Sequence, residues 1–337
     1  MPLGTSLAFR TDAMKITVLG SLESDDPKSY DVVVDQVASA LRKHKHRVSI
    51  LGVHDDLRKF VSGFSRRKPD LVFNLAETFG ESLNGDSGVA AVLDLLGIHY
   101  TGGGPGELYL RQDKGLAKKV LAFDGVQYPH FAIFGKDADL EAAGKLHMPL
   151  FVKPLTADAS IGIDGESLVR DAISLMKRVV MIHEKVGDSA LVEEYIEGRE
   201  FYVGVLGNRE PVAFPPVEMD FSGLPEGMPR VAGTKAKWKK NSVEYKGTKS
   251  VLAEVPDELR AKLQKAALDA YRALRVRDYG RVDLRLTETG EIYVIEVNAS
   301  CYLEENSEFA MGAKALGIEF PELVQRIVDL AVERYAI

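Results

Sequence analysis

The stretch GRVDLRLTETGEIYVIEVN constrains the fold most, because it predicts a hairpin with one charged and one apolar face. A turn centred on residues 289–290 brings Asp283 opposite Glu296 and Arg281 opposite Asn298. The apolar face pairs Val282 with Val297, Leu284 with Ile295 and Leu286 with Tyr293. Because burial of this face fixes the register, the four polar side chains share the other face.

This polar face predicts a metal site. Two carboxylates directly opposite each other repel unless a cation lies between them. Asp283, Glu296 and the amide of Asn298 offer oxygen atoms and no Cys/His cluster, which favours Mg²⁺ over zinc, with Mn²⁺ as an alternative. A solvent-facing hairpin decorated with charge would show the same alternation, so the hairpin alone leaves both interpretations open.

Composition excludes several classes of protein. A chain of 337 residues predicts two or three domains, and its net charge of −7 argues against non-specific binding of nucleic acid. One cysteine, Cys301, excludes an internal disulfide and fits the reducing cytoplasm. No apolar run is long enough to span a bilayer, and residues 1–13 lack the apolar segment of a signal peptide, so we expect no membrane role.

Strand and helix patterns alternate in the first third of the chain and predict a parallel α/β domain over residues 14–112. The expected elements are the strands KITVLG, RVSIL, DLVFNL and IHYTG, and helices around residues 33–41, 55–64 and 86–96. Gly102, Gly103, Gly104 and Gly106 follow. Because a dinucleotide-binding fingerprint should follow the first strand, these glycines are better interpreted as a hinge.

Two further units are expected, at residues 113–190 and 191–337. The first contains a helix over 113–123, the strand LFVKP, the small polar loop TADASIGIDGE and a helix over about 168–183. Such a loop is typical of a mobile cover over a ligand. The second contains LVEEYIEGREFYVGVLG, PVAFPPVEM, a helix from Pro256 to Leu274, the hairpin and two C-terminal helices.

The ordered segments DKGLAKK, LFVKP, LVEEYIEGREF, AKW, GRVDLRL and IEVN resemble the ATP-grasp superfamily, most closely its D-alanine–D-alanine ligase branch. The resemblance implies an α/β fold in which an N-terminal parallel α/β domain precedes two α+β lobes that enclose ATP. It also implies an ATP-dependent carboxylate–amine ligase: ATP phosphorylates a carboxylate, an amine attacks the acyl phosphate, and ADP and phosphate leave.

The resemblance implies roles for specific residues. Asp283, Glu296 and Asn298 are expected to hold two Mg²⁺ ions, while Arg281 stabilises the oxyanion and Ser307 holds the carboxylate of the second substrate. Residues expected to bind ATP are Lys114, Lys153, Ser160, Gly162, Glu193, Glu194, Tyr195, Ile196, Glu200 and Lys237. Other interpretations stay open: a solvated residue in a first helical turn for Lys114, a lysine that extends from a strand end for Lys153, and an exposed strand end for the glutamates. For Lys153, the following Pro154 at the end of an apolar strand favours a functional role.

The chain departs from the ligases around the substrates. Glu77-Thr78 replaces a His-Gly pair, and Tyr302 replaces a glycine whose amide joins the oxyanion hole. Glu304, Glu305 and Glu308 surround Ser307, either as a solvated helix start or facing the site. In the second case they predict a bulkier or cationic amine.

Two alternatives stay open: a true D-alanine–D-alanine ligase of cell-wall synthesis, and a non-catalytic nucleotide-binding protein. We expect small-molecule partners, no nucleic acid or membrane, and a cytoplasmic homodimer.

Overall fold

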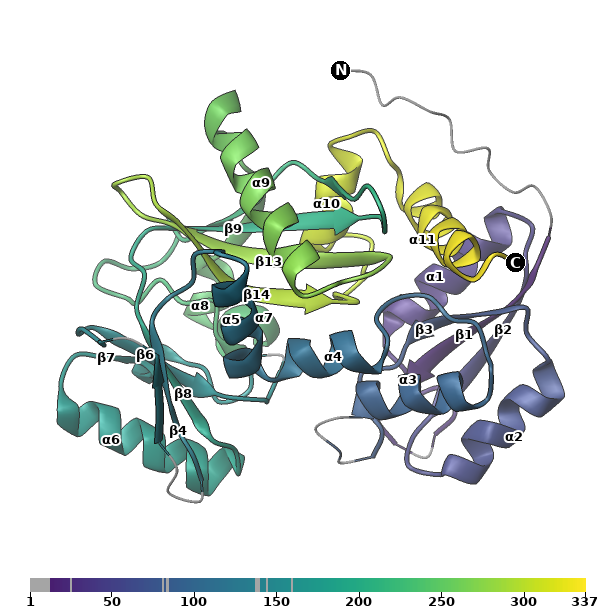
Figure 1. Ribbon diagram of the computed structural model, residues 1–337, viewed down its shortest axis with the longest axis horizontal. Helices are drawn as coiled ribbons and strands as arrows, with labels where there is room; N and C mark the ends of the chain where they lie inside the picture. Colours follow the sequence, from purple (N-terminus) through teal and green to yellow (C-terminus); the bar gives the residue numbers. More distant parts are fainter. Residues whose placement is uncertain are drawn as a thin grey trace.

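The computed structural model describes residues 13–24, 26–80, 82, 85–136, 140–143, 145–158 and 160–337. Three sheets occupy successive parts of the chain, and α4 runs between the first sheet and the other two (Figure 1). In the described ranges, no helix is both long and apolar enough to cross a membrane. The mixture of one parallel and two antiparallel sheets is the α/β class expected from the sequence.

The first sheet is parallel, with strand order β2-β1-β3. Its elements are β1 (Lys15–Ser21), α1 (Val32–Lys43), β2 (Arg47–Val53), α2 (Leu57–Arg67), β3 (Leu71–Leu75) and α3 (Gly85–Leu95). Asp31 and Asp56 start the first two helices because each side chain accepts a hydrogen bond from the exposed amides of the first turn. The predicted strand IHYTG is reduced to a single bridge between Tyr100 and Val72.

The C-terminal helix packs on this first sheet although it is remote in sequence. Helix α11 (Phe320–Tyr335) lies beside α1 (Figure 1) and buries Leu323, Val324 and Ile327 in a core shared with Val33 and Val37. Burial of these apolar side chains therefore holds α11 against α1.

The second sheet is antiparallel and has the order β5-β4-β8-β6-β7. Its strands are β4 (Phe131–Phe134), β5 (Leu140–Ala143), β6 (Leu150–Pro154), β7 (Leu168–Val169) and β8 (Ala190–Glu194); α4 (Pro105–Gln112) and α5 (Lys114–Phe123) precede it, and α6 (Ala172–Met181) continues into a π-helix (Ile182–Val186). The predicted helix over 168–183 begins late because Asp171 caps it, and Leu168 belongs to β7.

The third sheet holds the hairpin. Its strands are β9 (Arg199–Leu206), β10 (Val212–Ala213), β11 (Val217–Asp220), β12 (Lys249–Leu252), β13 (Tyr279–Leu286) and β14 (Ile292–Ala299), accompanied by α7 (Thr234–Trp238), α8 (Val243–Gly247), α9 (Asp257–Ala273) and α10 (Glu308–Lys314). Asp283 is opposite Glu296 and Arg281 opposite Asn298, as predicted. The register then shifts, so Leu284 pairs with Val294 and Leu286 with Ile292.

This shift corrects two of the predicted apolar pairs. Leu284 does not face Ile295, and Leu286 does not face Tyr293, because β14 carries one extra residue at a β-bulge. The bulge comes directly before Glu296. It leaves the predicted polar pairs intact and sends Ile295 into the lining of a pocket.

The sheets also bear on the proposed domain limits. The limit at residue 190 falls at the start of β8, whose partners β4 and β6 belong to the second sheet. We therefore propose a limit after Glu194.

The glycine segment 102–106 packs closely against Ser300, since a Cβ on Gly102 would lie 2.4 Å from Oγ of Ser300. Its use as a hinge stays a prediction.

Candidate active site

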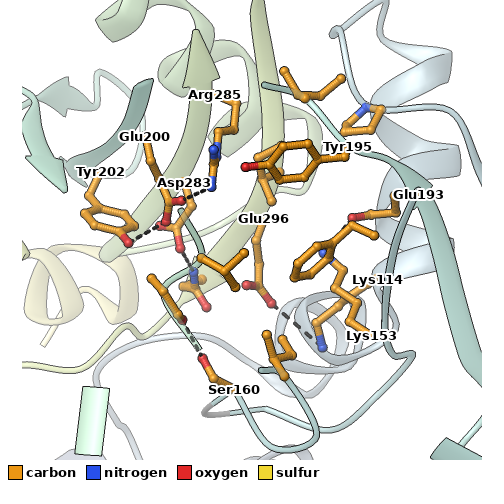
Figure 2. Close-up of a pocket in the computed structure, with 18 of the residues that line it drawn as sticks. Lys114, Lys153, Ser160, Glu193, Tyr195, Glu200, Tyr202, Asp283, Arg285 and Glu296 are labelled. Atoms are coloured by element: carbon orange, nitrogen blue, oxygen red, sulfur yellow. Dashed lines mark hydrogen bonds and ion pairs between the residues drawn. The ribbon is translucent and has the colours of Figure 1, made fainter. Parts of the chain in front are cut away.

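A pocket between the second and third sheets collects the predicted site (Figure 2). Every predicted site residue except Gly162 and Ser307 lines it. The lining includes Lys114, Lys153, Ser160, Glu193, Glu194, Tyr195, Ile196, Glu200, Lys237, Arg281, Asp283, Glu296 and Asn298. These residues come from α5, β6, β8, β9, α7, the hairpin and two connecting segments, which hold Ser160, Tyr195 and Ile196. Folding therefore brings together groups that are far apart in the sequence.

The polar face of the hairpin forms one end of the pocket. Nε and Nη2 of Arg281 donate to the two oxygens of Asp283 at 2.7 and 3.0 Å, and Nδ2 of Asn298 lies 3.3 Å from the same carboxylate. Burial raises the pKa of Asp283 to about 6, although Arg281 opposes the shift. A second cation near this carboxylate would further favour its charged form.

This donor set fits a hard divalent ion in part. Two carboxylates and one amide supply oxygen atoms from adjacent strands, as Mg²⁺ requires. In the described part of the chain, no group of three or more His, Cys, Asp or Glu side chains could hold a metal ion. The hairpin therefore fits an ion whose remaining ligands come from a bound phosphate or water, which is common for Mg²⁺.

Lysines form the opposite wall. Lys114 follows the helix cap Asp113, and its Nζ donates to the carbonyl of Ala157 at 2.9 Å and lies 3.8 Å from Glu296. Lys153 is buried at the end of β6, 2.9 Å from Glu193. Although burial opposes it, Glu193 raises the pKa of Lys153. Both lysine side chains line the pocket (Figure 2).

The other end of the pocket combines an aromatic pair with the segment that joins β8 to β9. The ring of Tyr195 stacks on Phe151 with centroids 6.3 Å apart. Glu194 turns away toward His147, 2.8 Å from its Nδ1. Phe151, Tyr195 and Ile196 line this end of the pocket.

Glu200, which also lines the pocket, is tightly held. Its two oxygens accept from Tyr202 and from Arg285, each at 2.6 Å. Arg285 also donates to the carbonyl of Arg230 at 2.9 Å, which fixes a segment whose Val231 lines the pocket.

The described residues of the loop 156–166 border one side of the pocket, which Ala157, Asp158, Ser160 and Ile163 line. Thr234, the first residue of α7, joins it: its amide donates to the carbonyl of Ile163 at 3.1 Å and its hydroxyl to the carbonyl of Ser160. Ser160 lines the pocket, whereas Gly162 lies behind it and its carbonyl accepts from Arg178 at 2.6 Å. The mobility of this loop stays a prediction.

Ser307 lies outside the pocket lining. Its hydroxyl caps α10 by accepting from the amide of Ala310. The acidic residues around it are also engaged: Glu308 lies 3.2 Å from Arg281, while Glu304 accepts from Gln36 of α1 at 3.0 Å. The sequence-based idea that Glu304 attracts a cationic amine therefore has no geometric support, because its carboxylate is turned to the first domain.

Comparison with known proteins decides the family. The protein-family model described as D-ala D-ala ligase C-terminus matches residues 112–329 of this chain. The D-alanine--D-alanine ligase of Desulforudis audaxviator is 32% identical over 310 residues, which cover 88% of this chain and 92% of that protein. The chain belongs to the D-alanine–D-alanine ligase family. It is thus an ATP-dependent ligase of the ATP-grasp fold.

The chain is also similar to a further protein and to a solved structure. An uncharacterised protein, y4sG of Sinorhizobium fredii, is 32% identical over 311 residues, covering 90% of this chain and 88% of that protein. The crystal structure of D-alanine--D-alanine ligase from Bacillus anthracis complexed with ATP superposes with a TM-score of 0.75 at 23% identity, covering 96% of this chain and 99% of that one. At this identity the superposition supports the fold.

Several residues that line this ligase's pocket were not predicted as site residues from the sequence, among them Phe151, Tyr202 and Arg285. Arg285 could have been found, since it continues the alternation of Arg281 and Asp283 along β13 and is directly opposite Glu200 on β9. Tyr202 is likewise opposite Asp283. The side chain of Arg281 lies over the Tyr202 ring at 4.8 Å, so this ring holds the arginine in place.

A second pocket lies where the first sheet meets the third. It is lined by Ser21, Asp31, Val33, Val34, Asn74, Leu75, Ala76, Glu77, Asp86, Leu108, Arg111, Tyr279, Ser300, Cys301, Tyr302 and Leu303. The hydroxyl of Tyr302 donates to Asp31 across the two sheets at 3.1 Å. Arg111 joins the two pockets, because it binds Asp86 at 2.6 Å and Asp158 of the loop at 2.8 Å.

Proposed function

We propose that this ligase transfers the γ-phosphoryl group of ATP to a substrate carboxylate and then joins that carboxyl carbon to an amine. One observation carries the proposal: the hairpin residues Asp283, Glu296 and Asn298 converge with three lysines and two arginines on one pocket between the two antiparallel sheets. Both steps develop negative charge on oxygen, and fixed cations around a recessed site lower that cost.

The nucleotide is proposed to lie along the pocket from its aromatic end to the hairpin. Phe151 and Tyr195 offer flat apolar contact for a base, and the backbone at Tyr195 and Ile196 offers polar groups for its edge. We expect Glu200 to accept hydrogen bonds from ribose hydroxyls. Lys114 and Lys153 would then meet the phosphates, together with Lys237 of α7.

Asp283, Glu296 and Asn298 would hold Mg²⁺, with two ions expected from the family resemblance. When bound, Mg²⁺ neutralises phosphate oxygens and fixes the transferring group in line. Arg281 is positioned by Asp283, Glu308 and the Tyr202 ring, and its permanent charge would stabilise the oxyanion of the tetrahedral intermediate.

The second pocket is proposed to bind the organic substrates. It lies at the carboxyl ends of β1 and β3, where the strand order β2-β1-β3 reverses, and open parallel sheets bind ligands at such points. Among the charged residues that line it, Asp31, Asp86 and Arg111 are hydrogen-bonded to described side chains, whereas Glu77 has no such bond among the described residues. We propose that Glu77 receives a substrate ammonium group.

The proposed substrate pair therefore includes an amino acid, and Tyr302 restricts its size and shape. A D-alanine–D-alanine ligase activity is the first alternative, supported by the relatives. A cytoplasmic homodimer stays a prediction; the single cysteine supports the location.

Phosphate release by the purified protein tests this proposal. The protein would be given Mg-ATP and pairs of amino acids, D-alanine included, with bulky and cationic amines as acceptors. Release that requires both a carboxylate and an amine, with a new amide seen by mass spectrometry, is expected. ATP binding without any pair-dependent release across the panel would instead favour the non-catalytic nucleotide-binding alternative.

A further inference from the structure

Lys118 is a buried lysine that lines neither of the two pockets described above. It lies on α5 one helical turn after Lys114, and only 2% of its surface is exposed. A lysine is rarely buried to this extent, because removal of an ammonium group from water is costly unless partners compensate. Its contacts therefore indicate what it does.

The ammonium group of Lys118 has two partners from different strands. It lies 2.8 Å from Oε1 of Glu193 on β8 and donates to the carbonyl of Ile295 on β14 at 3.3 Å. The other oxygen of Glu193 lies 2.9 Å from Lys153. Lys118 thus joins α5 to both antiparallel sheets through Glu193 and Ile295, two residues that line the pocket between these sheets.

Charge explains why two lysines flank one carboxylate. Burial tends to raise the pKa of Glu193, but the two lysines outweigh it and lower the pKa, so the carboxylate is ionised. Burial lowers the pKa of Lys118, and Glu193 opposes that shift. The two oxygens of Glu193 lie 2.8 Å from Lys118 and 2.9 Å from Lys153, so with both lysines protonated the group carries one net positive charge. With Lys153 alone, the pair would be neutral, and its ammonium would be fully engaged with Glu193.

We infer that Lys118 is a positioning residue of the nucleotide site: it holds one oxygen of Glu193, and thereby keeps the ammonium group of Lys153 as the excess cation that faces ATP. Its second bond, to Ile295, fixes the β-bulge directly before Glu296. This inference rests on the proposed nucleotide site, but it concerns a residue that does not touch the nucleotide.

Binding of Mg-ATP without other substrates, measured by calorimetry, tests the inference. Lys118→Met should weaken binding by about tenfold or more, the effect expected when a charged hydrogen-bond partner is removed. Lys119→Met is the matched control, because Lys119 is the next residue on the same helix and is exposed. It should bind as the wild type does. If Lys118→Met does not fold, Lys118→Gln, a neutral donor at the same position, replaces it.

A double-mutant cycle separates positioning from general loosening of the fold. If Lys118 acts through Glu193, Lys118→Met should change binding by less than about twofold in a Glu193→Gln background. Equal losses in both backgrounds, or unchanged binding by Lys118→Met, would overturn the inference. Wild-type protein that does not bind Mg-ATP would overturn the proposed function as well, so the two failures are distinguishable.

Discussion

The two pockets differ in how their charges are satisfied. In the pocket between the antiparallel sheets, Glu193, Glu200 and Asp283 each have cationic partners within 3.0 Å. In the pocket at the first sheet, Glu77 has no hydrogen-bonded partner among the described side chains. A preorganised site for ATP needs fixed charges, whereas a substrate site can leave one charge for its ligand. The following predictions test this difference.

The largest effect is expected at the hairpin. Asp283→Asn or Glu296→Gln should lower the rate of ligation by on the order of a thousandfold, because each removes an oxygen ligand and a charge from the proposed Mg²⁺ site. Circular dichroism should stay unchanged, since the apolar face of the hairpin is untouched. Glu291→Gln, in the exposed turn of the same hairpin, is the control and should be as active as the wild type. Wild-type turnover by either site variant would contradict the metal assignment.

A smaller loss is expected from Arg281→Lys. Lysine keeps the charge but cannot bind both oxygens of Asp283, so kcat should fall by about a hundredfold while the KM for ATP changes little. Steady-state kinetics would measure both constants. A rise in the KM for ATP with unchanged kcat would mean that Arg281 serves nucleotide binding.

Glu77→Gln should separate the two pockets. The KM for the amino-acid substrate should rise by about tenfold, because the ammonium group loses a charged partner. The affinity for Mg-ATP should be unchanged, since Glu77 does not line the nucleotide pocket. Equal losses in both constants would show that the pockets do not act separately.

The smallest effect concerns stability against pH. Although Glu77 has exposed surface, the protein atoms around it reduce its hydration and raise its pKa from 4.5 to about 7. Arg111 opposes this shift, and Asp158, Asp31 and Asp86 add to it. The folded state thus binds this proton more tightly than the unfolded chain, and the stability that it contributes is lost as the pH rises from about 4.5 to about 7. The Tm of Glu77→Gln relative to wild type, measured without ligands, should therefore increase over this window and then level off. A difference that does not depend on pH would mean that Glu77 is fully solvated.

Local pattern predicted most of the elements and the polar face of the hairpin. Polar and apolar residues alternate along β13 and β14, and aspartates cap α1 and α5. These features depend on residues that are close in the sequence, so they can be recognised from the sequence alone. The pairing of Asp283 with Glu296 was predicted for the same reason.

What the sequence did not predict depends on tertiary packing. After the bulge at Ile295, Leu284 and Leu286 still pair with apolar residues, Val294 and Ile292. The pattern of polar and apolar residues is therefore compatible with either register and does not reveal the bulge. Ser307 fits a family motif and also a helix cap, and only the fold places it at the start of α10. The direction of Glu304 follows from α1, which lies at the other end of the sequence. Contacts of this kind are not encoded in spacing.

The proposed mechanism requires that the γ-phosphoryl group of ATP passes to a substrate carboxylate. An amino-acid substrate labelled with ¹⁸O in its carboxyl group tests it most directly, because attack of the amine on an acyl phosphate leaves one carboxyl oxygen in the released phosphate. We predict one ¹⁸O atom in each phosphate formed during amide synthesis, measured by mass spectrometry. Amide synthesis with unlabelled phosphate, or with release of AMP and pyrophosphate, would contradict the account.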